Sequence, residues 1–279
     1  MTNRHKREDK EDFPWWLVAV GLTALYLGIE VARSDVYAQI MNTLWRGVGI
    51  TVFVTVVSFF SASVLGMALA LGADSRWLVL RQTCRFYVEV VRGVPIIVLL
   101  LYVAFVLAPA LVDLRNWLGS FIGLEEIRTR NFPLLWRAIV ALMIAYSAFI
   151  AEVFRAGLQS VPEGQVEAAQ ALGLNCWQRF RFIVFPQAIR TILPPLGNDF
   201  VALVKDSSLV SVLGVADITQ MGKVYAASSF RFFETYSIVA YIYLLLTIGL
   251  SLILRGIERR MRQKARLARD ASTGAFPPA

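Results

Sequence analysis

Long apolar stretches constrain this chain more than any other feature of its sequence. Six of them approach or exceed the ~20 residues that a helix needs to cross the ~30 Å hydrocarbon core of a bilayer. They cover residues 15–32, 47–72, 86–110, 133–154, 196–221 and 236–254. Because 57% of the 279 residues are hydrophobic and only 17% are charged, a soluble globular fold is excluded. The sequence predicts an all-α integral membrane protein with about six transmembrane helices.

The first apolar run follows Arg4, Lys6, Arg7 and Lys10, as the core of a secretory signal follows basic residues. Its end, Glu30-Val31-Ala32, does not offer the small-x-small pattern of a cleavage site. We therefore expect residues 15–32 to form an uncleaved membrane helix.

The positions of Lys and Arg predict the orientation of the helices, because cytoplasmic flanks carry an excess of these residues. With both termini in the cytoplasm, 18 basic residues flank the inner ends of the six runs and 8 flank the outer ends, while Arg92 and Lys205 lie within runs. The sequence thus predicts a multi-pass protein with cytoplasmic termini. Cys84 and Cys176 then face the reducing side of the membrane, and we expect both to be free thiols.

Several functional classes are excluded by what the chain lacks. The one histidine, His5, and the two distant cysteines build neither a metal site nor a disulfide framework. No G-x-x-x-x-G-K-[ST] motif occurs, since Gly222-Lys223 is followed by valine, so we expect no ATP site and no other cofactor on this chain. A membrane enzyme would lack the usual histidine base near the membrane. The basic residues 259–279 follow a spanning run directly, so they are interpreted as an orientation signal that contacts anionic lipid, with no nucleic-acid partner.

The loop between the fourth and fifth runs, residues 157–192, is too polar to cross a membrane and too patterned to be a slack linker. Strong helix formers fill residues 164–173, which predicts a short helix that opens after Pro162 and is stopped by Gly173. A second short helix is expected to start at Asn175 and to end at Pro186. Its apolar positions recur at helical spacing, so it can lie in the membrane interface; they are Trp177, Phe180, Ile183 and Val184.

The spacing of Glu167-Ala168-Ala169, Gly173, Ile183 and Phe185-Pro186 resembles the EAA loop of ABC importer permeases, although that family has leucine where Phe185 stands. Other motifs look like those of the polar amino acid uptake permeases. They are Glu89-Val-Val-Arg92-Gly93-Val-Pro95, Gly164-Gln165, Pro186-Gln187-Ala188, Pro194-Pro195-Leu196-Gly-Asn198 and Lys205-Asp206-Ser207-Ser208-Leu209. The resemblance covers roughly residues 44–255.

The resemblance implies a five-helix permease core preceded by one extra N-terminal helix, in the inner membrane of a bacterial cell. Residues 1–42 would then hold a cytoplasmic tail, the extra helix and a short external loop, residues 43–258 the permease domain, and residues 259–279 a basic cytoplasmic tail. It also implies partners: two copies of a cytoplasmic ATPase that holds ATP and Mg²⁺, a second permease subunit in a homo- or heterodimer, and an extracytoplasmic amino-acid-binding protein. The residues implied in coupling to the ATPase are Glu167, Ala168, Ala169, Gly173 and Pro186.

Charges at membrane depth are candidates for function because they are costly there. Glu89 and Arg92 are three residues apart, so they share a helix face and are expected to neutralise each other. Glu152 and Arg155 repeat this arrangement. Each pair either lines the transport pathway or forms a boundary ion pair that reaches toward the cytoplasm.

Four polar residues, Lys205, Asp206, Ser207 and Ser208, interrupt the middle of the fifth run. Such a break is tolerated only where it faces protein or a water-filled cavity. The alternatives are a direct role with substrate or in gating, and structural hydrogen bonding between helices. The full set of pathway candidates is Glu89, Arg92, Glu152, Asn198, Lys205, Asp206, Ser207 and Ser208.

Together these observations predict the pore-forming subunit of an ATP-driven importer for polar amino acids, which is not itself an enzyme. The alternative is a stand-alone ion-coupled transporter, which would place coupling carboxylates at the midplane and often show internal repeats. No repeat is evident between the two halves of this chain.

Overall fold

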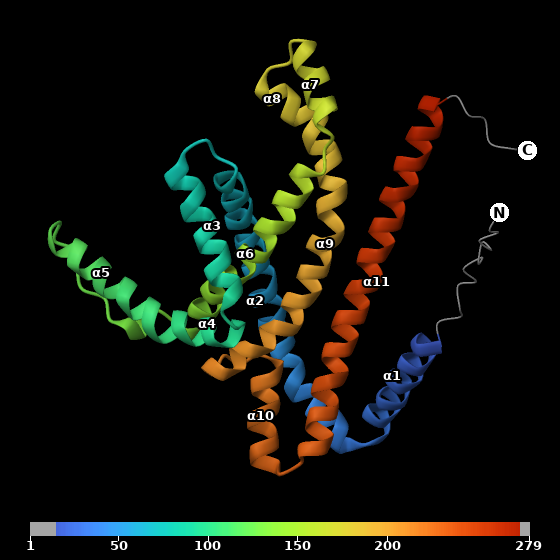
Figure 1. Ribbon diagram of the computed structural model, residues 1–279. Helices are drawn as coiled ribbons and strands as arrows, with labels where there is room; N and C mark the ends of the chain where they lie inside the picture. Colours follow the sequence, from blue (N-terminus) through green and yellow to red (C-terminus); the bar gives the residue numbers. More distant parts are fainter. Residues whose placement is uncertain (1–14, 274–279) are drawn as a thin grey trace, which may run out of the picture.

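The computed structural model describes residues 15–273, and every regular element within them is a helix (Figure 1). In chain order the elements are α1 (Trp15–Arg33), α2 (Asp35–Ala73), α3 (Leu78–Gly93), α4 (Ile96–Tyr102), the π-helical turn η1 (Val103–Leu107), α5 (Ala108–Ser120), the 3₁₀ turn η2 (Thr129–Asn131), α6 (Leu134–Gln159), α7 (Glu163–Ala171), α8 (Cys176–Arg179), the π-helical turn η3 (Phe180–Val184), α9 (Phe185–Asp206), the 3₁₀ turn η4 (Ser207–Leu213), α10 (Ile218–Ser229) and α11 (Phe232–Thr273). Residues 1–14, with His5, and residues 274–279 lie outside the described part of the chain.

The all-α membrane architecture is confirmed. Four helical segments in the described residues are long and apolar enough to span a membrane, and they overlap four of the six expected runs. They are Asp35–Ala73, Ile96–Ser120, Leu134–Gln159 and Phe232–Ile257. A count of six transmembrane helices is not confirmed.

The core of the bundle lies where α2 crosses α6 and α9. Fully buried side chains from the three helices, such as Val54, Leu142 and Leu203, form one cluster there. α2 and α6 approach closely because a small residue stands at their crossing: a Cβ on Gly66 would lie only 2.9 Å from the backbone oxygen of Ser147. This close packing gives the bundle its fixed scaffold.

A second tight junction lies at the end of the bundle opposite α7, where the N-terminal half of α2 meets α10 and α11 (Figure 1). Asp217 caps α10 by accepting hydrogen bonds from the backbone N–H groups of Thr219 and Gln220 and from the Tyr243 hydroxyl. A Cβ on Gly47 of α2 would lie 2.7 Å from the backbone of Asp217. Glycine is therefore required there by the close approach of two backbones.

The expected third span, residues 86–110, is not one helix. α3 ends at Gly93, Val94 is extended, and α4 begins after Pro95. The physical reason is the proline, whose ring disfavours helical geometry in the residue before it. Glu89 and Arg92 therefore belong to α3, a helix separate from the apolar segment that follows.

The expected fifth span, residues 196–221, is also divided. α9 starts eleven residues earlier, at Phe185, and ends at Asp206; η4 follows, and Gly214 (φ 78°) turns the chain toward α10. The interruption at residues 205–208 is confirmed, but its position in mid-span is wrong. Lys205 and Asp206 close a long helix, and Ser207 opens the 3₁₀ turn.

Pro186 does not end a helix, contrary to expectation. α8, η3 and α9 follow one another without a break from Cys176 to Asp206, and Pro186 is the second residue of α9. A proline in a helix lacks the N–H group and crowds the carbonyl four residues back. The π-helical turn η3 lies directly before it and widens the helix at the point where the ring needs room.

Two helices are longer than the runs that predicted them. α2 has 39 residues, about 58 Å of helix, which exceeds a bilayer core. α11 continues to Thr273 and so extends through most of the segment expected as a basic tail, residues 259–279.

Candidate functional site

The short helix α7 stands beyond one end of the bundle, together with α8 (Figure 1). It begins after Pro162, as expected, and its last turn closes with two backbone hydrogen bonds: Gly173 N to Gln170 O (2.9 Å) and Leu174 N to Ala169 O (3.1 Å). Gly173 has a φ of 78°, so it adopts the left-handed conformation that favours glycine. The prediction that Gly173 stops this helix is confirmed.

The exposed side of α7 carries most of the residues implied in coupling. Glu167 and Ala168 are exposed, while Ala169 is buried within the loop and anchors α7 to it. Gly173 is exposed beside them, and Pro186 lies half-buried in α9. The helix thus presents small side chains beside two exposed carboxylates, those of Glu163 and Glu167.

Side-chain hydrogen bonds fasten α7 to the helix that follows it. The Arg179 guanidinium donates to the Gln170 side chain (2.7 Å), and the Gln187 amide donates to the Gln165 side chain (2.5 Å). Asn175 caps α8 through reciprocal hydrogen bonds with Gln178, which confirms that the second helix starts there. Because α8 continues through η3 into α9, α7 is joined to the bundle by continuous helix.

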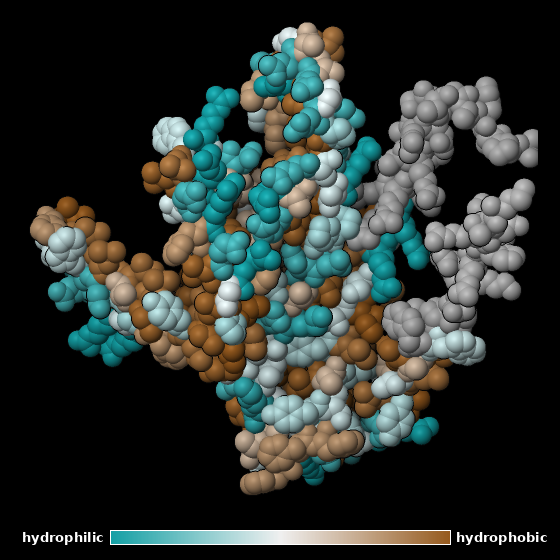
Figure 2. All heavy atoms as spheres, viewed as in Figure 1, coloured by the Kyte–Doolittle hydropathy of each residue, from teal (hydrophilic) through white to brown (hydrophobic). Residues whose placement is uncertain are grey.

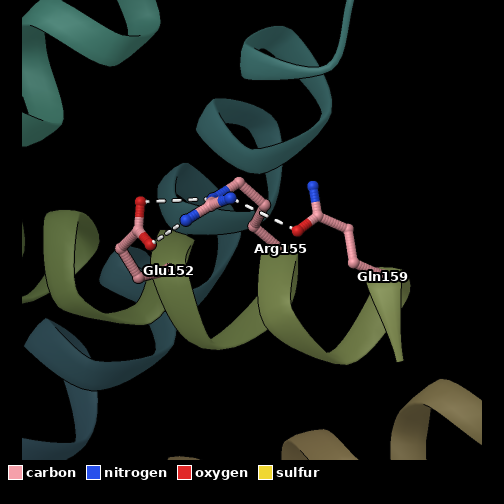
Figure 3. Close-up of polar contacts among 3 residues, drawn as sticks. All are labelled: Glu152, Arg155 and Gln159. Atoms are coloured by element: carbon pink, nitrogen blue, oxygen red, sulfur yellow. Dashed lines mark hydrogen bonds and ion pairs between the residues drawn. The ribbon is translucent and has the colours of Figure 1, made fainter.

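The Glu152–Arg155 pair on α6 is confirmed (Figure 3). Arg155 donates from Nη2 to Glu152 Oε2 (2.5 Å) and from Nε to Oε1 (3.3 Å), and it also reaches the Gln159 side chain. Both partners are partly exposed, so the ion pair contributes little to stability.

The expected Glu89–Arg92 pair is wrong. No ion pair joins them in the described residues; the Arg92 guanidinium lies 5.9 Å from the centre of the Phe149 ring on α6. A cation over an aromatic face is an alternative to a carboxylate partner. Glu89 instead lines a polar cavity of about 410 Å³ between α2, α3 and α6, together with Arg85, Glu152 and Arg155.

The polar break after α9 separates side chains with different partners. Asp206 accepts a hydrogen bond from the Tyr146 hydroxyl of α6 (2.7 Å), and buried Ser207 donates to the backbone oxygen of Val204 (2.7 Å). Ser208 is half-buried and Asn198 is exposed on α9. Lys205 is exposed, and within the described residues no hydrogen bond or ion pair is found for it. Two of the four polar residues are thus engaged in packing.

Asp199 is a site residue that the sequence analysis missed. It lies seven residues before Asp206, two turns along α9, so both carboxylates share a helix face. Its Oδ2 atom is buried without a hydrogen-bond partner in the described part of the chain. The sequence offered one signal for Asp199, its spacing of two helical turns from the polar break. The burial that makes it a candidate is not visible in the sequence. An unpaired buried carboxylate is costly and marks a place for a cation or donor.

Comparison with known proteins agrees with this architecture. The sequence matches the family described as "binding-protein-dependent transport system inner membrane component" over residues 62–263. It is 35% identical over 219 residues to the glutamine transport system permease protein GlnP of Escherichia coli (strain K12), covering 78% of this chain and 93% of the relative. It is 34% identical over 226 residues to the probable amino-acid permease protein YxeN of Bacillus subtilis (strain 168), covering 80% and 93%.

Two solved structures resemble the fold. A chain from the crystal structure of an amino acid ABC transporter with histidines has a TM-score of 0.67 and 34% identity, with 80% of this chain and 96% of that chain covered. A chain of the MetNI methionine ABC transporter in an inward-facing conformation has a TM-score of 0.61, with 81% and 98% covered, and at 23% identity it shows the fold alone. The chain therefore belongs to the family of inner membrane components of binding-protein-dependent transport systems.

Proposed function

We propose that this chain forms the transmembrane pathway of an ATP-driven importer that moves polar amino acids into the cytoplasm. Members of its family act with an ATPase and a substrate-binding protein, and relatives that it resembles are named as glutamine and amino-acid permeases. The observation that carries the proposal is α7: a capped, exposed helix at one end of the bundle, fastened to α9 through α8.

The ATPase surface would be α7. Two copies of the ATPase would hold ATP and Mg²⁺ and would each receive one α7, from this chain and from a second permease subunit. Glu167 and Ala168 would contact the ATPase, because they are exposed, whereas Ala169 and Gly173 hold the helix in shape. No cofactor is assigned to this chain itself.

The substrate pathway would pass the acidic face of α9. Asp199 and Asp206 offer carboxylates to the ammonium group of an amino acid, and the exposed Lys205 offers a cation to its carboxylate. Glu89, Arg92 and Glu152 lie nearer the α7 end and would form the exit. A stand-alone carrier would also use buried carboxylates, but it would have no use for an exposed α7.

Purification in mild detergent tests the assembly. We expect an ATP-binding subunit to co-purify, and reconstituted vesicles to take up labelled glutamine or a similar polar amino acid only with ATP and a binding protein present. Uptake driven by an ion gradient in vesicles that lack any ATPase would contradict the proposal.

Thiol labelling tests the proposed orientation, with α7 and both termini in the cytoplasm of a bacterial inner membrane. Cys176, at the start of α8, is exposed, whereas Cys84 is buried against Gly72. A membrane-impermeant maleimide should label Cys176 in inside-out vesicles but not in intact spheroplasts, and Cys84 should not react in either. Labelling of Cys176 from outside would reverse the orientation.

A further inference from the structure

One segment leaves the bundle and returns to it without contributing to its core. Residues 108–133 follow α4 and η1, run outward along α5 and come back through η2 to the start of α6 (Figure 1). We call residues 108–133 the lateral arm. Its helix, α5, is part of Ile96–Ser120, one of the four helical segments in the described residues that are long and apolar enough to span a membrane.

The two ends of this excursion meet at the start of α6. Arg137, in the first turn of α6, is buried and donates hydrogen bonds to the backbone oxygens of Ala104 in η1 (3.1 Å), Phe132 (2.8 Å) and Thr129. The chain therefore enters the arm and leaves it at one guanidinium group. A segment that returns to its starting point does not cross a bilayer once, whatever its composition.

The arm holds its own shape as a hairpin. The Asn116 side chain pairs with both backbone groups of Ile127, donating to its oxygen (2.7 Å) and accepting from its N–H (3.0 Å). Arg115 donates to the backbone oxygen of Glu125. Gly119 is buried, and a Cβ there would lie 3.2 Å from Leu124. The returning segment, residues 121–133, thus packs closely against one side of α5.

The opposite side of α5 has no partner in the described chain. Four large apolar side chains of α5 cover it, and two more follow directly after the helix end; each is between 49% and 74% exposed. They are Leu111, Leu114, Trp117 and Leu118, then Phe121 and Ile122. At 100° per residue the four on α5 occupy a single arc of the helix. The returning segment carries charged, exposed residues instead, which are Glu125, Glu126, Arg128 and Arg130. The arm is therefore a two-layered structure with one apolar face and one polar face.

The two layers are stacked along the long axis of the bundle. Figure 2 shows hydrophobic atoms on the side of the arm that faces the α7 end, and hydrophilic atoms along its far edge. The apolar face is thus turned toward the depth that the spanning helices occupy, and the polar face away from it. A second protein chain beside the bundle would require no such division along the membrane normal, whereas a lipid leaflet requires it.

We infer that the lateral arm lies in the lipid leaflet at the end of the bundle opposite α7, with its apolar face in the acyl chains of phospholipids and its polar layer in the headgroup region. Trp117 suits this depth because an indole has an apolar body and one N–H donor. Arg137 then ties a lipid-embedded arm to the first turn of α6. The identity of this leaflet as the outer one rests on the proposed orientation, but the contact with lipid does not.

Fluorescence quenching in vesicles tests this inference. Leu118→Cys on the apolar face and Glu126→Cys on the polar layer are made separately in full-length chain that carries Cys84→Ser and Cys176→Ser. Each is labelled with a nitrobenzoxadiazole fluorophore and reconstituted at high dilution in phosphatidylethanolamine and phosphatidylglycerol vesicles. We expect nitroxide lipids to quench the label at 118 roughly threefold more than the label at 126, and aqueous iodide to show the reverse order. Leu114→Cys, on the same face, should repeat the result for 118.

Three outcomes would overturn the inference. Iodide quenching of the label at 118 would place the face in water. Protection from both quenchers, lost as lipid is added to dilute the protein, would assign the face to a second copy of this chain. Labels at Leu111→Cys and Ile122→Cys that differ in depth by the ~16 Å expected for eleven residues of helix along the membrane normal would make α5 a spanning helix. None of these readouts depends on substrate or ATP, so a failure of the proposed transport function would leave them unchanged.

Discussion

The two ends of α9 differ in how they are stabilised. At its start, α7, α8 and η3 are joined by local interactions: a glycine turn, a capping box and hydrogen bonds between near neighbours. Toward its end, Asp206 accepts a hydrogen bond from Tyr146 of α6, which is distant in sequence, and Asp199, two turns earlier, keeps a buried oxygen without a partner in the described residues. The first end is held by neighbours in sequence, and the second places charged groups inside the bundle. In the proposed importer, force would enter at the first end and substrate would pass the second.

The largest effect is expected where the rigid end depends on one backbone angle. Gly173→Val puts a β-branched residue at a φ of 78°, which should cost at least ~1 kcal/mol and distort the end of α7. Amino-acid uptake and substrate-stimulated ATP hydrolysis should fall by an order of magnitude or more in reconstituted vesicles, while membrane insertion persists. Gly164→Ala is the matched control, because a Cβ there meets nothing within 4 Å and the φ is ordinary. Normal coupling in Gly173→Val would remove α7 from the mechanism.

Replacing the two carboxylates of α9 one at a time tests the acidic end. Asp199→Asn should lower uptake by about tenfold with little loss of stability, since its buried oxygen has no protein partner to lose. Asp206→Asn weakens a charged hydrogen bond to Tyr146 and should reduce stability by about 1–2 kcal/mol as well. Uptake measured beside thermal unfolding in detergent distinguishes the two. Equal losses of stability in both variants would mean that both carboxylates serve packing alone.

Local signals explain why one end was predicted better than the other. Pro162, Gly173 and Asn175 act on the residues beside them, so the sequence located α7 and the start of α8 correctly. Pro186 was misjudged because the turn that accommodates it, η3, is not a pattern of residue types. The Glu89–Arg92 pair was wrong because a ring from another helix, Phe149, lies beside the arginine.

Position within the fold explains the remaining differences. The break at residues 205–208 was found from its polarity, but its place at a helix end depends on where α9 begins, eleven residues before the apolar run. Residues 96–120 have the composition of a span, yet contacts through Arg137 return the chain to its starting point. Composition and local spacing therefore determine element types, while the partners of individual charges come from packing.

The reactivity of cysteines placed in the polar break, at residues 205 and 207, tests whether the end of α9 is accessible to solvent. Lys205→Cys should react with small polar maleimides several times faster than Ser207→Cys, because Lys205 is exposed and Ser207 is fully buried. Trapping the complex with a nonhydrolysable nucleotide should change the rate at position 205, since closure driven through α7 would change the surroundings of the end of α9. Equal rates at the two positions, insensitive to nucleotide, would assign this segment to helix packing only.

The smallest effect is expected from loosening the rigid end without changing its backbone. Arg179→Ala removes the hydrogen bond to Gln170 that ties α8 to α7. The bond is exposed, so its loss should cost less than ~1 kcal/mol, and the fold should persist. If α7 and α8 must move as one body, part of each displacement will be absorbed between them, and uptake per ATP hydrolysed should fall about twofold while ATP hydrolysis itself continues. Arg181→Ala is the control, because Arg181 is exposed two residues further on, carries the same charge and has no such bond to α7 among the described residues. A loss shared by both variants would point to charge at the membrane surface, whereas a loss confined to Arg179→Ala would show that rigidity between the two helices transmits the motion.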